Sequence, residues 1–365
     1  MGSNIVLSVI ITAYEYGNYI EDAIVSALQQ SLPRESYEII VVDDGSTDST
    51  RQIAAKYLPR IVYCYKENGG QASAFNLGLG IARGEYVAFL DADDYWHPDK
   101  LQIVLTAFKS DPSVDVVYHP LNTVDADKRP KGMTPSLPAN SFYYGRPVEF
   151  SLNHFTPAGS TSSGMSWRRD VLKKLCPIPE VYRICADGYL MCCAPLAARK
   201  FHLIGDHLGY YRLHGGNNYA QIGFSDSLLS PRSNELASYY KSLCMNDLIR
   251  LSRELNKCDN GLIREIRSAC LTDDLLTIRQ QRGVFLAVVA LWRRRGELSG
   301  LPWKLFLFRV SLVILKLLVP FSMTSKLQRI YMSSSLCLLV LRYIKNDRRI
   351  AVSKDQTSPS VISIS

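Results

Sequence analysis

The sequence of 365 residues lacks the cysteine patterns that mark a disulfide framework or a zinc ribbon. Its nine cysteines are an odd number, and no two of them form a Cys-x-x-Cys pair. A secretory signal is also missing, because residues 1–4 carry no basic side chain and the apolar run that follows, 5–11, is only seven residues long. Apolar residues at 47% and charged residues at 21% exclude a disordered or coiled-coil chain. We therefore expect a globular protein of a reducing compartment, the cytoplasm.

Long hydrophobic runs are missing as well, although the C-terminal third is rich in apolar residues. Between residues 279 and 349 the longest stretch without a charged side chain is the 12 residues 330–341, whereas a transmembrane helix needs about 20. The same segment carries 14 lysines and arginines and two acidic residues, so its net charge is +12. Because the whole chain has a net charge of +8, the rest of the chain has a net charge of −4. This pattern favours helices that lie on an anionic membrane surface. A helical bundle packed on the body of the protein is the alternative, and the absence of a nucleic-acid motif argues against a nucleic-acid partner.

The first hundred residues alternate short β-branched runs with helical patterns. We expect strands at 7–11, 38–42, 61–65 and 86–90, and helices at 19–30, 48–56, 71–83 and 98–109. Nearly continuous apolar strands separated by helices are typical of a parallel sheet covered on both faces. Such a sheet binds its ligand at the carboxyl ends of its strands, where the loops gather.

The pattern is looser beyond about residue 111. Residues 121–150 are rich in Pro, Gly, Asn and Tyr, which predicts a long loop or an irregular hairpin. The elements expected after it are strands at 164–167, 202–204 and 209–213, a helix at 169–175, a helix that begins at Asp187, and a linker at 225–231. The rest of the chain is predicted to be helical and increasingly basic.

Acidic side chains follow two of the expected strands. Asp43 and Asp44 come after the second strand, and the run Asp91-Ala92-Asp93-Asp94 comes after the fourth. Five carboxylates at one edge of a sheet repel one another unless a cation or hydrogen-bond donors neutralise them. An Asp-x-Asp strand end suits a hard, oxygen-binding cation such as Mg²⁺ or Mn²⁺, whose remaining ligands would be phosphate oxygens. The sequence therefore predicts a diphosphate ligand, and the second acidic pair argues against a merely solvated helix start.

Five segments, in this order along the chain, resemble the inverting family 2 glycosyltransferases with the GT-A fold. They are residues 8–14, 41–48, 68–78, 84–94 and 208–218. Each motif is weak by itself, but the ordered set is specific, and the resemblance covers roughly residues 5 to 220. It implies an α/β fold with a mostly parallel sheet flanked by helices and a Rossmann-like nucleotide-binding half. To this fold the sequence adds a helical, basic C-terminal extension.

The resemblance also implies which residues contact a nucleotide-sugar donor. Tyr14 would stack on the base, a carboxylate of Asp43 or Asp44 would accept a hydrogen bond from it, and Asp91 and Asp93 would hold the metal and diphosphate. The residues expected at the donor are Thr12, Ala13, Tyr14, Asp43, Asp44, Lys66, Gly70, Asn76, Asp91, Ala92 and Arg212. The chain departs from the family where it has Glu15 in place of Asn and Phe75 in place of Arg, and Lys66 is a candidate for the missing charge.

Two further residues are assigned by resemblance to the chemistry. Asp187 lies where the family has its catalytic base, at the start of a helix; an N-cap is its ordinary role there, and the two roles are compatible because a helix N-terminus favours an ionised carboxylate. His214, in a segment that resembles a closing loop of the family, is a candidate metal ligand beside Asp91 and Asp93, or a candidate contact for a donor phosphate. A solvent-exposed turn histidine is the alternative.

The function expected is the transfer of a sugar, with inversion, from a nucleotide-diphosphate sugar to a saccharide or lipid-linked acceptor such as a polyprenol-linked one. A UDP-sugar is the donor expected first, Mn²⁺ or Mg²⁺ the cofactor, and bacterial surface polysaccharide synthesis the setting. The division expected is a nucleotide-sugar half at 1–110, an acceptor and catalytic half at 111–224 and a membrane-associated extension at 225–365 on the inner face of the cell membrane. A nucleotidyltransferase and an inactive sugar-binding protein are the alternatives; Tyr14-Glu15-Tyr16 lacks the basic, Gly-rich phosphate loop of the former.

Overall fold

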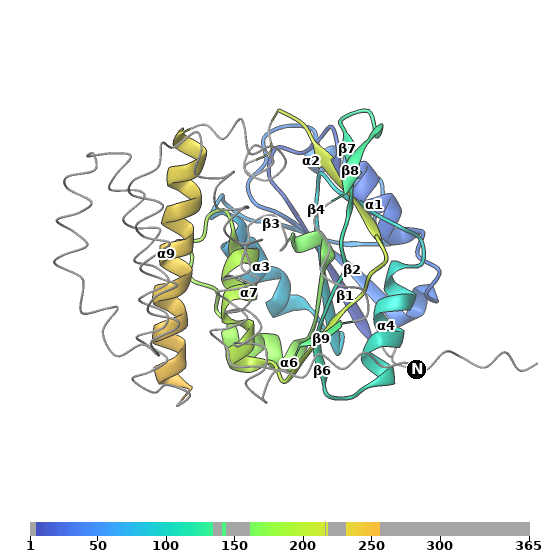
Figure 1. Ribbon diagram of the computed structural model, residues 1–365. Coiled ribbons are helices and arrows are strands. Elements are labelled where there is room, and N and C mark those ends of the chain that lie inside the picture. Colours follow the sequence, from blue (N-terminus) through green and yellow to red (C-terminus); the bar gives the residue numbers. More distant parts are fainter. Residues whose placement is uncertain (1–4, 134–140, 144–160, 216, 218–230, 256–365) are drawn as a thin grey trace, which may run out of the picture.

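The computed structural model describes residues 5–133, 141–143, 161–215, 217 and 231–255. Its centre is an eight-stranded sheet covered by helices on both faces (Figure 1). In spatial order the strands are β3 (Val62–Tyr65), β2 (Tyr37–Asp43), β1 (Leu7–Ala13), β4 (Tyr86–Asp91), β10 (Met165–Arg168), β6 (Val114–Tyr118), β11 (Lys200–Leu203) and β9 (Ser141–Tyr143). The expected α/β class with a mostly parallel sheet is confirmed.

The parallel part of the sheet consists of β3, β2, β1 and β4. Thr12 near the end of β1 is in register with Val42 on one side and Asp91 on the other. The three central strands therefore end together, at one edge of the sheet. All seven residues of β1 and of β2 are buried, which explains their nearly continuous apolar sequence.

The two faces of the sheet have separate hydrophobic cores. Ile10 of β1 packs in one core with Phe75 of α3 (Gln71–Ile81), whereas Val9 and Ile11 pack in the other with α1 (Ile20–Leu28) and α4 (Lys100–Ser110). This alternation follows from the two-residue period of side chains along a strand. The short helix α2 (Thr50–Ala55) contributes Ala54 to the second core.

One antiparallel strand joins the parallel part to the rest of the sheet. β10 is antiparallel to both β4 and β6, and beyond it β11 runs parallel to β6. The helices α6 (Arg169–Leu172) and α7 (Ala186–Ala197) cover the same face as α3, and α9 (Pro231–Glu254) packs on α7. Tyr182 ties α9 to the body, because its hydroxyl donates to Asp247 Oδ2 at 2.8 Å.

A second, four-stranded sheet carries the segment that follows residue 208. Its order is β5 (Tyr95–Trp96), β12 (Gly209–Leu213), β7 (Asn122–Asp125) and β8 (Pro130–Met133). β7 and β8 form an antiparallel pair with a register shift, so the irregular hairpin expected within 121–150 is confirmed for these residues. β12 lies between β5 and β7, which places the residues after it beside the Asp91–Asp94 run.

The strand β6 is the main element that the sequence did not reveal. Its second residue is Asp115, which breaks the apolar run; the fully buried Asp115 carboxylate accepts hydrogen bonds from the main-chain and side-chain nitrogens of Arg199. The expected linker at 225–231 lies outside the described residues except for Pro231, which begins α9. The basic segment 279–349 also lies outside them.

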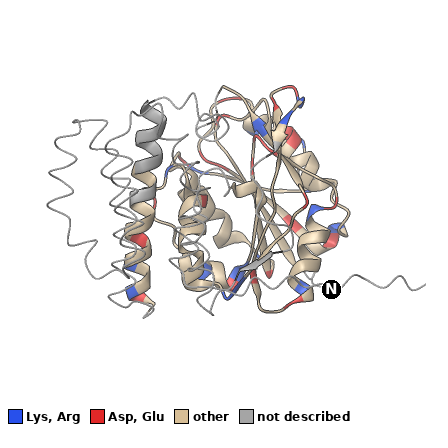
Figure 2. Ribbon diagram, in the orientation of Figure 1, with Lys and Arg blue, Asp and Glu red and all other residues tan. Residues whose placement is uncertain are grey.

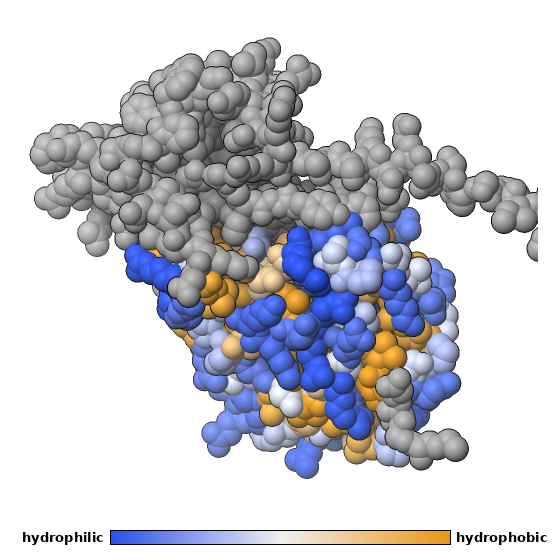
Figure 3. Space-filling view, turned by 90° about the horizontal axis from the view of Figure 1, so that it is seen from below, coloured by the Kyte–Doolittle hydropathy of each residue, from blue (hydrophilic) through white to orange (hydrophobic). Residues whose placement is uncertain are grey.

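The surface of the described part carries charges of both signs. Along the ribbon of Figure 2 the positions of acidic and basic residues are interspersed, and on the face that Figure 3 shows, the described apolar residues lie among hydrophilic ones. Within the described ranges, no helix has both the length and the apolar character needed to cross a bilayer.

Candidate active site

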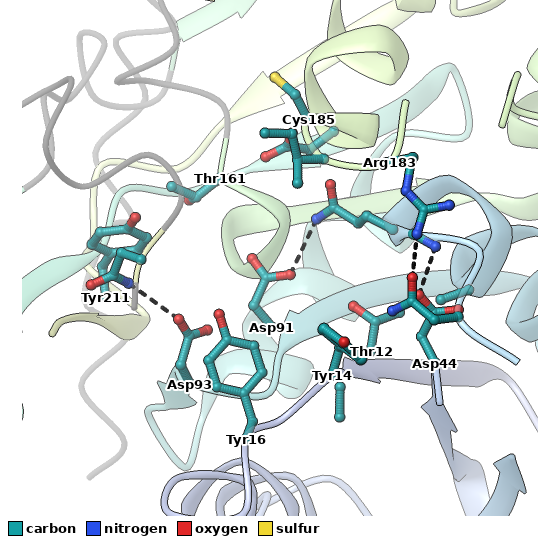
Figure 4. A pocket seen from close by; sticks show the side chains of 18 residues that line it. Thr12, Tyr14, Tyr16, Asp44, Asp91, Asp93, Thr161, Arg183, Cys185 and Tyr211 are labelled. Atoms are coloured by element: carbon teal, nitrogen blue, oxygen red, sulfur yellow. Dashed lines mark hydrogen bonds between the residues drawn. The ribbon is translucent and has the colours of Figure 1, made fainter. Parts of the chain in front are cut away.

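A cavity of about 380 Å³ opens where β1, β2 and β4 end and the N-termini of α3 and α7 meet (Figure 4). It is lined by Thr12, Ala13, Tyr14, Tyr16, Asp44, Asn68, Gly70, Gln71, Ala74, Asp91, Asp93, Thr161, Arg183, Ile184, Cys185, Asp187, Tyr211 and Asn217. Eight of these residues were predicted from the sequence: Thr12, Ala13, Tyr14, Asp44, Gly70, Asp91, Asp93 and Asp187. The structure therefore brings together residues that are almost 180 positions apart in the sequence.

One end of the cavity is organised by Asp44. Its carboxylate accepts hydrogen bonds from the main-chain N–H of Gly69 at 2.9 Å and of Gly70 at 2.6 Å, and from Lys66 Nζ at 2.8 Å. Gly70 has a φ of +88°, and a Cβ there would lie 2.4 Å from Arg183 Cα. Only glycine fits this turn. Tyr14 is 49% exposed beside it, so its ring is available for stacking on a base.

Asp43 lies outside the cavity lining, unlike its neighbour. It is completely buried, and it accepts hydrogen bonds from the Tyr63 hydroxyl at 2.5 Å and from the main-chain N–H of Ser46 at 2.8 Å. These bonds hold the turn after β2. Of the two carboxylates between which the sequence left the choice open, the structure places Asp44 at the cavity.

Four other residues expected at the donor also lie outside the lining. Lys66 forms an ion pair with Asp44. Ala92 is buried, and its main-chain N–H donates a hydrogen bond to the Thr12 carbonyl at 3.2 Å. Asn76 exchanges two hydrogen bonds with the backbone of Ile178, both at 2.8 Å. These three residues bind other parts of the protein and do not line the cavity. The fourth residue, Arg212, is described next.

Arg212 shows the largest departure from expectation. Its side chain is 3% exposed and forms an ion pair with Asp22 at 2.7 Å, while its Nε donates to the Asp93 carbonyl at 2.9 Å. Its main-chain N–H donates to Asp94 Oδ1 at 3.0 Å. Arg212 was expected to bind the diphosphate. In the structure it instead hydrogen-bonds Asp93 and Asp94 and so stabilises the backbone of the acidic run.

The acidic run is crowded. Withdrawal from water and repulsion from Asp93 raise the pKa of Asp91 and of Asp94 well above the usual range. Asp94 accepts a hydrogen bond from Ser163 Oγ at 2.6 Å, whereas Asp93 faces the segment after β12. His214 Nε2 lies 3.0 Å and Asn217 Nδ2 lies 3.2 Å from Asp93 Oδ2.

The candidate ligands for a metal ion are the carboxylates of Asp91 and Asp93. The imidazole of His214 lies within hydrogen-bond distance of Asp93. Carboxylate oxygens suit Mg²⁺ or Mn²⁺, and a cation would relieve the repulsion that raises the pKa of Asp91. Within the described part of the chain, however, no three His, Cys, Asp or Glu side chains lie close enough together to hold an ion. The chemistry of the two carboxylates nevertheless fits a divalent cation whose remaining ligands come from outside the protein.

Asp187 is the second residue of α7, lines the cavity, and is close enough to Asp91 for its charge to help raise the pKa of that carboxyl. Its Oδ1 accepts the main-chain N–H of Gly188 at 2.7 Å, so the carboxylate also binds the helix N-terminus. Withdrawal from water raises the pKa of Asp187 to about 6, and the hydrogen bonds to it oppose that rise. A carboxylate with such a pKa is ionised at neutral pH and is a stronger base than an exposed one.

Sequence reasoning missed several lining residues. Arg183 is the one Lys or Arg side chain among the described lining residues, and it hydrogen-bonds Asn68 Oδ1. Tyr16 and Tyr211 stand near Asp93, where withdrawal from water, reinforced by nearby carboxylates, raises the pKa of each hydroxyl and keeps it protonated. The signal for Arg183 and Cys185 was their closeness to Asp187; no signal pointed to Thr161.

The sheet order and the acidic cavity at its edge agree with the GT-A fold that the sequence predicts. The family model described as glycosyl transferase family 2 matches residues 8–176. An uncharacterized glycosyltransferase from Nostoc sp. is 38% identical over 229 residues, which are 60% of this chain and 69% of that protein. The chain belongs to glycosyl transferase family 2.

Other relatives match a smaller part of the chain. Chondroitin synthase from Pasteurella multocida is 36% identical over 155 residues, which are 42% of this chain but only 15% of that protein. Among solved structures, residues 1–349 of TarS from S. aureus superpose with a TM-score of 0.58 at 19% identity, covering 89% of this chain and 91% of that one. This likeness supports the GT-A fold.

Proposed function

We propose that the protein transfers a sugar, with inversion at the anomeric carbon, from a UDP-sugar to a hydroxyl of a saccharide or lipid-linked saccharide acceptor. The observation that carries this proposal is one cavity that holds a nucleotide-facing end, Thr12 to Asp44, a pair of strand-end carboxylates, Asp91 and Asp93, and a separate carboxylate, Asp187. Structures of the similarly folded TarS were solved with UDP and with UDP-GlcNAc, at TM-scores of 0.51 and 0.52. They support a uridine nucleotide in the corresponding position.

The chemical step assigned to this chain is a single displacement. Asp187 takes the proton of the acceptor hydroxyl as the hydroxyl oxygen forms a bond to the anomeric carbon. The bond from that carbon to the diphosphate oxygen breaks at the same time, and the diphosphate leaves with the electron pair. Because attack and departure occur on opposite faces of the sugar, the configuration inverts.

The donor is assigned to the part of the cavity that Tyr14 and Asp44 line. Tyr14 offers an exposed ring for the base, and the Gly69–Gly70 turn, held by Asp44, shapes the space next to it. Asp91 and Asp93, with His214 beside Asp93, would hold Mn²⁺ or Mg²⁺ together with phosphate oxygens of the donor. Such an ion would neutralise charge on the leaving diphosphate.

The acceptor and its setting are proposed from relatives and from charge. A putative teichuronic acid biosynthesis glycosyltransferase from Bacillus subtilis is 48% identical over 101 residues, which are 26% of this chain and 39% of that protein. Its name and that of the chondroitin synthase refer to polysaccharides. We extend this to surface polysaccharide synthesis, with the basic segment 279–349 on the cytoplasmic membrane face, near polyprenol-linked acceptors.

The test is a panel of nucleotide-sugars assayed for Mn²⁺-dependent hydrolysis and transfer, with wild type and Asp187→Asn. The variant should keep its affinity for UDP while transfer falls by about 10²–10⁴-fold, the usual size of a general-base contribution. The control variant Asp99→Asn removes a carboxylate at the start of α4, outside the described cavity lining. It should change neither the affinity for UDP nor the rate of transfer. Wild-type turnover by Asp187→Asn would remove Asp187 from the mechanism, and binding without turnover of any donor would indicate a sugar-binding protein.

A further inference from the structure

Gln71, the first residue of α3, joins two parts of the cavity that are far apart in the sequence. Its Oε1 accepts the main-chain N–H of Ala186 at 2.9 Å. Its Nε2 donates to Ser162 Oγ at 3.3 Å and, at the long end of hydrogen-bond range, to Asp91 Oδ1 at 3.5 Å. The second contact is the dashed line that leads from Asp91 in Figure 4.

The amide of Gln71 can be oriented in only one way that satisfies these partners. The partner on one side is an N–H donor, which needs the carbonyl oxygen, and those on the other side are a hydroxyl and a carboxylate, which can accept from the NH₂ group. The backbone at this point is fixed as well, since the N–H of Gln71 donates to the Arg183 carbonyl at 2.8 Å and that of Ala72 to the Tyr182 carbonyl at 3.1 Å.

The two contacts of the Gln71 amide lead to two carboxylates with different proposed roles, Asp187 through Ala186 and Asp91 directly. Ala186 begins α7 and directly precedes Asp187, while Asp91 ends β4. Ser162, which accepts from Gln71 Nε2, lowers the pKa of both Asp91 and Asp187 and so opposes the rise caused by burial. Gln71 therefore connects the helix that carries the base to the strand end that faces the diphosphate.

We propose that Gln71 is a positioning residue that fixes the place of Asp187 relative to Asp91. This inference rests on the proposed function, in which the first removes a proton and the second faces the leaving group. A reacting group displaced by about 1 Å can lose on the order of 100-fold in rate. An amide that spans the gap between α3, α7 and β4 is placed to prevent such a displacement.

Two substitutions separate the two halves of the link. Gln71→Met has nearly the same length and loses both contacts, so kcat for transfer should fall by about tenfold or more while calorimetric affinity for UDP with Mn²⁺ stays within about twofold. Gln71→Glu keeps an oxygen for the Ala186 N–H and replaces the donor by a second carboxylate at Asp91. Because this breaks the Asp91 half of the link, kcat should fall by about threefold or more, a smaller loss than in Gln71→Met.

The matched control is Gln102→Met, the same change at an exposed glutamine in the first turn of α4, which should leave both measurements unchanged. The proposal is overturned if Gln71→Met or Gln71→Glu keeps wild-type kcat, or if the affinity of Gln71→Met for UDP with Mn²⁺ falls as much as its kcat does. Should Gln71→Met not fold, Gln71→Asn, whose amide is one carbon shorter, replaces it with the same expected loss of kcat.

Failure of this inference is distinguishable from failure of the proposed function. If Asp187→Asn is inactive and Gln71→Met is fully active, the base assignment stands and the positioning role is wrong. If Asp187→Asn turns over at the wild-type rate, the proposed mechanism is wrong whatever the Gln71 variants do.

Discussion

At the scale of single residues, Asp187 has a property that is visible in the pH dependence of the reaction. Its pKa is raised to about 6 because it is withdrawn from water, and it must be ionised to act as a base. Protonation below this pKa removes the base. We therefore expect kcat/KM to rise with pH up to about 6 and to level off above it.

The control for this pH profile is the residual activity of Asp187→Asn, measured over the same range. An asparagine cannot titrate, so the rise near pH 6 should disappear from its profile. A variant that keeps the same rise would assign the titration to another group, and Asp187 would no longer explain it.

Asp93 gives the second prediction at this scale. Its carboxylate faces His214 and Asn217, and its charge raises the pKa of Asp91 and Asp94. Asp93→Ala should abolish Mn²⁺-dependent binding of UDP and leave the melting temperature unchanged or higher, because one repulsive charge is gone. Isothermal calorimetry and thermal unfolding measure the two effects.

The comparison for Asp93→Ala is Asp127→Ala, which removes an exposed carboxylate from the β7–β8 hairpin. That variant should bind UDP as the wild type does. Unchanged UDP affinity of Asp93→Ala in Mn²⁺ would contradict the assignment of Asp93 to the metal and diphosphate.

At the scale of elements, the helix α3 offers a matched pair of glycines. Gly70 precedes the helix at a φ of +88°, and a Cβ added to it would lie 2.4 Å from Arg183 Cα, whereas a Cβ on Gly80 would meet nothing within 4 Å. Gly70→Ala should lower the free energy of unfolding by at least about 1–2 kcal/mol, the cost of a left-handed conformation. Gly80→Ala should raise it by roughly 0.5–1 kcal/mol, because alanine loses less backbone entropy in a helix.

Urea denaturation of both glycine variants checks this prediction, since their midpoints should move in opposite directions from that of the wild type. Gly70→Ala should also weaken UDP binding, because the turn that it changes lines the cavity. A Gly70→Ala variant as stable as the wild type would show that the turn before α3 can relax away from Arg183.

Regular elements were predictable from the sequence where local patterns decide them. The strands β1, β2 and β4 are buried on both faces and therefore read as apolar runs, and α1 buries Ile20, Ala23, Ile24 and Ala27 at helical spacing. The position of β10 between β4 and β6 depends on pairing between distant segments, which no local pattern encodes.

The site was predictable to the extent that strand ends define it. Thr12, Asp44 and Asp91 follow or end strands of the parallel sheet, and their closeness follows from that arrangement alone. The roles of Arg212 and Gln71 depend on partners more than 100 residues away, Asp22 for the first and Ala186 for the second. Such contacts exist only after the fold has formed.

At the scale of the whole molecule, the basic segment 279–349 gives a prediction about the membrane. If it lies on the membrane, each basic residue near an anionic surface contributes about 1 kcal/mol. Reversal of Arg293, Arg294 and Arg295 to Glu should strongly reduce co-sedimentation with anionic vesicles, and high salt should reduce that of the wild type by screening. Salt-resistant sedimentation would indicate a spanning helix, and no sedimentation would indicate a bundle packed on the body.

The antiparallel insertion of β10 has a consequence for the order in which the chain can fold. While residues up to Asp91 emerge from the ribosome, the outer edge of β4 has no partner, because the strand that pairs with it is Met165–Arg168. An open strand edge is a template for pairing with other chains. Completion of the sheet must therefore wait for the synthesis of β10, and closing so long a loop slows the step. A nascent chain that stalls between β4 and β10 is the form of this protein most exposed to aggregation and most in need of a chaperone.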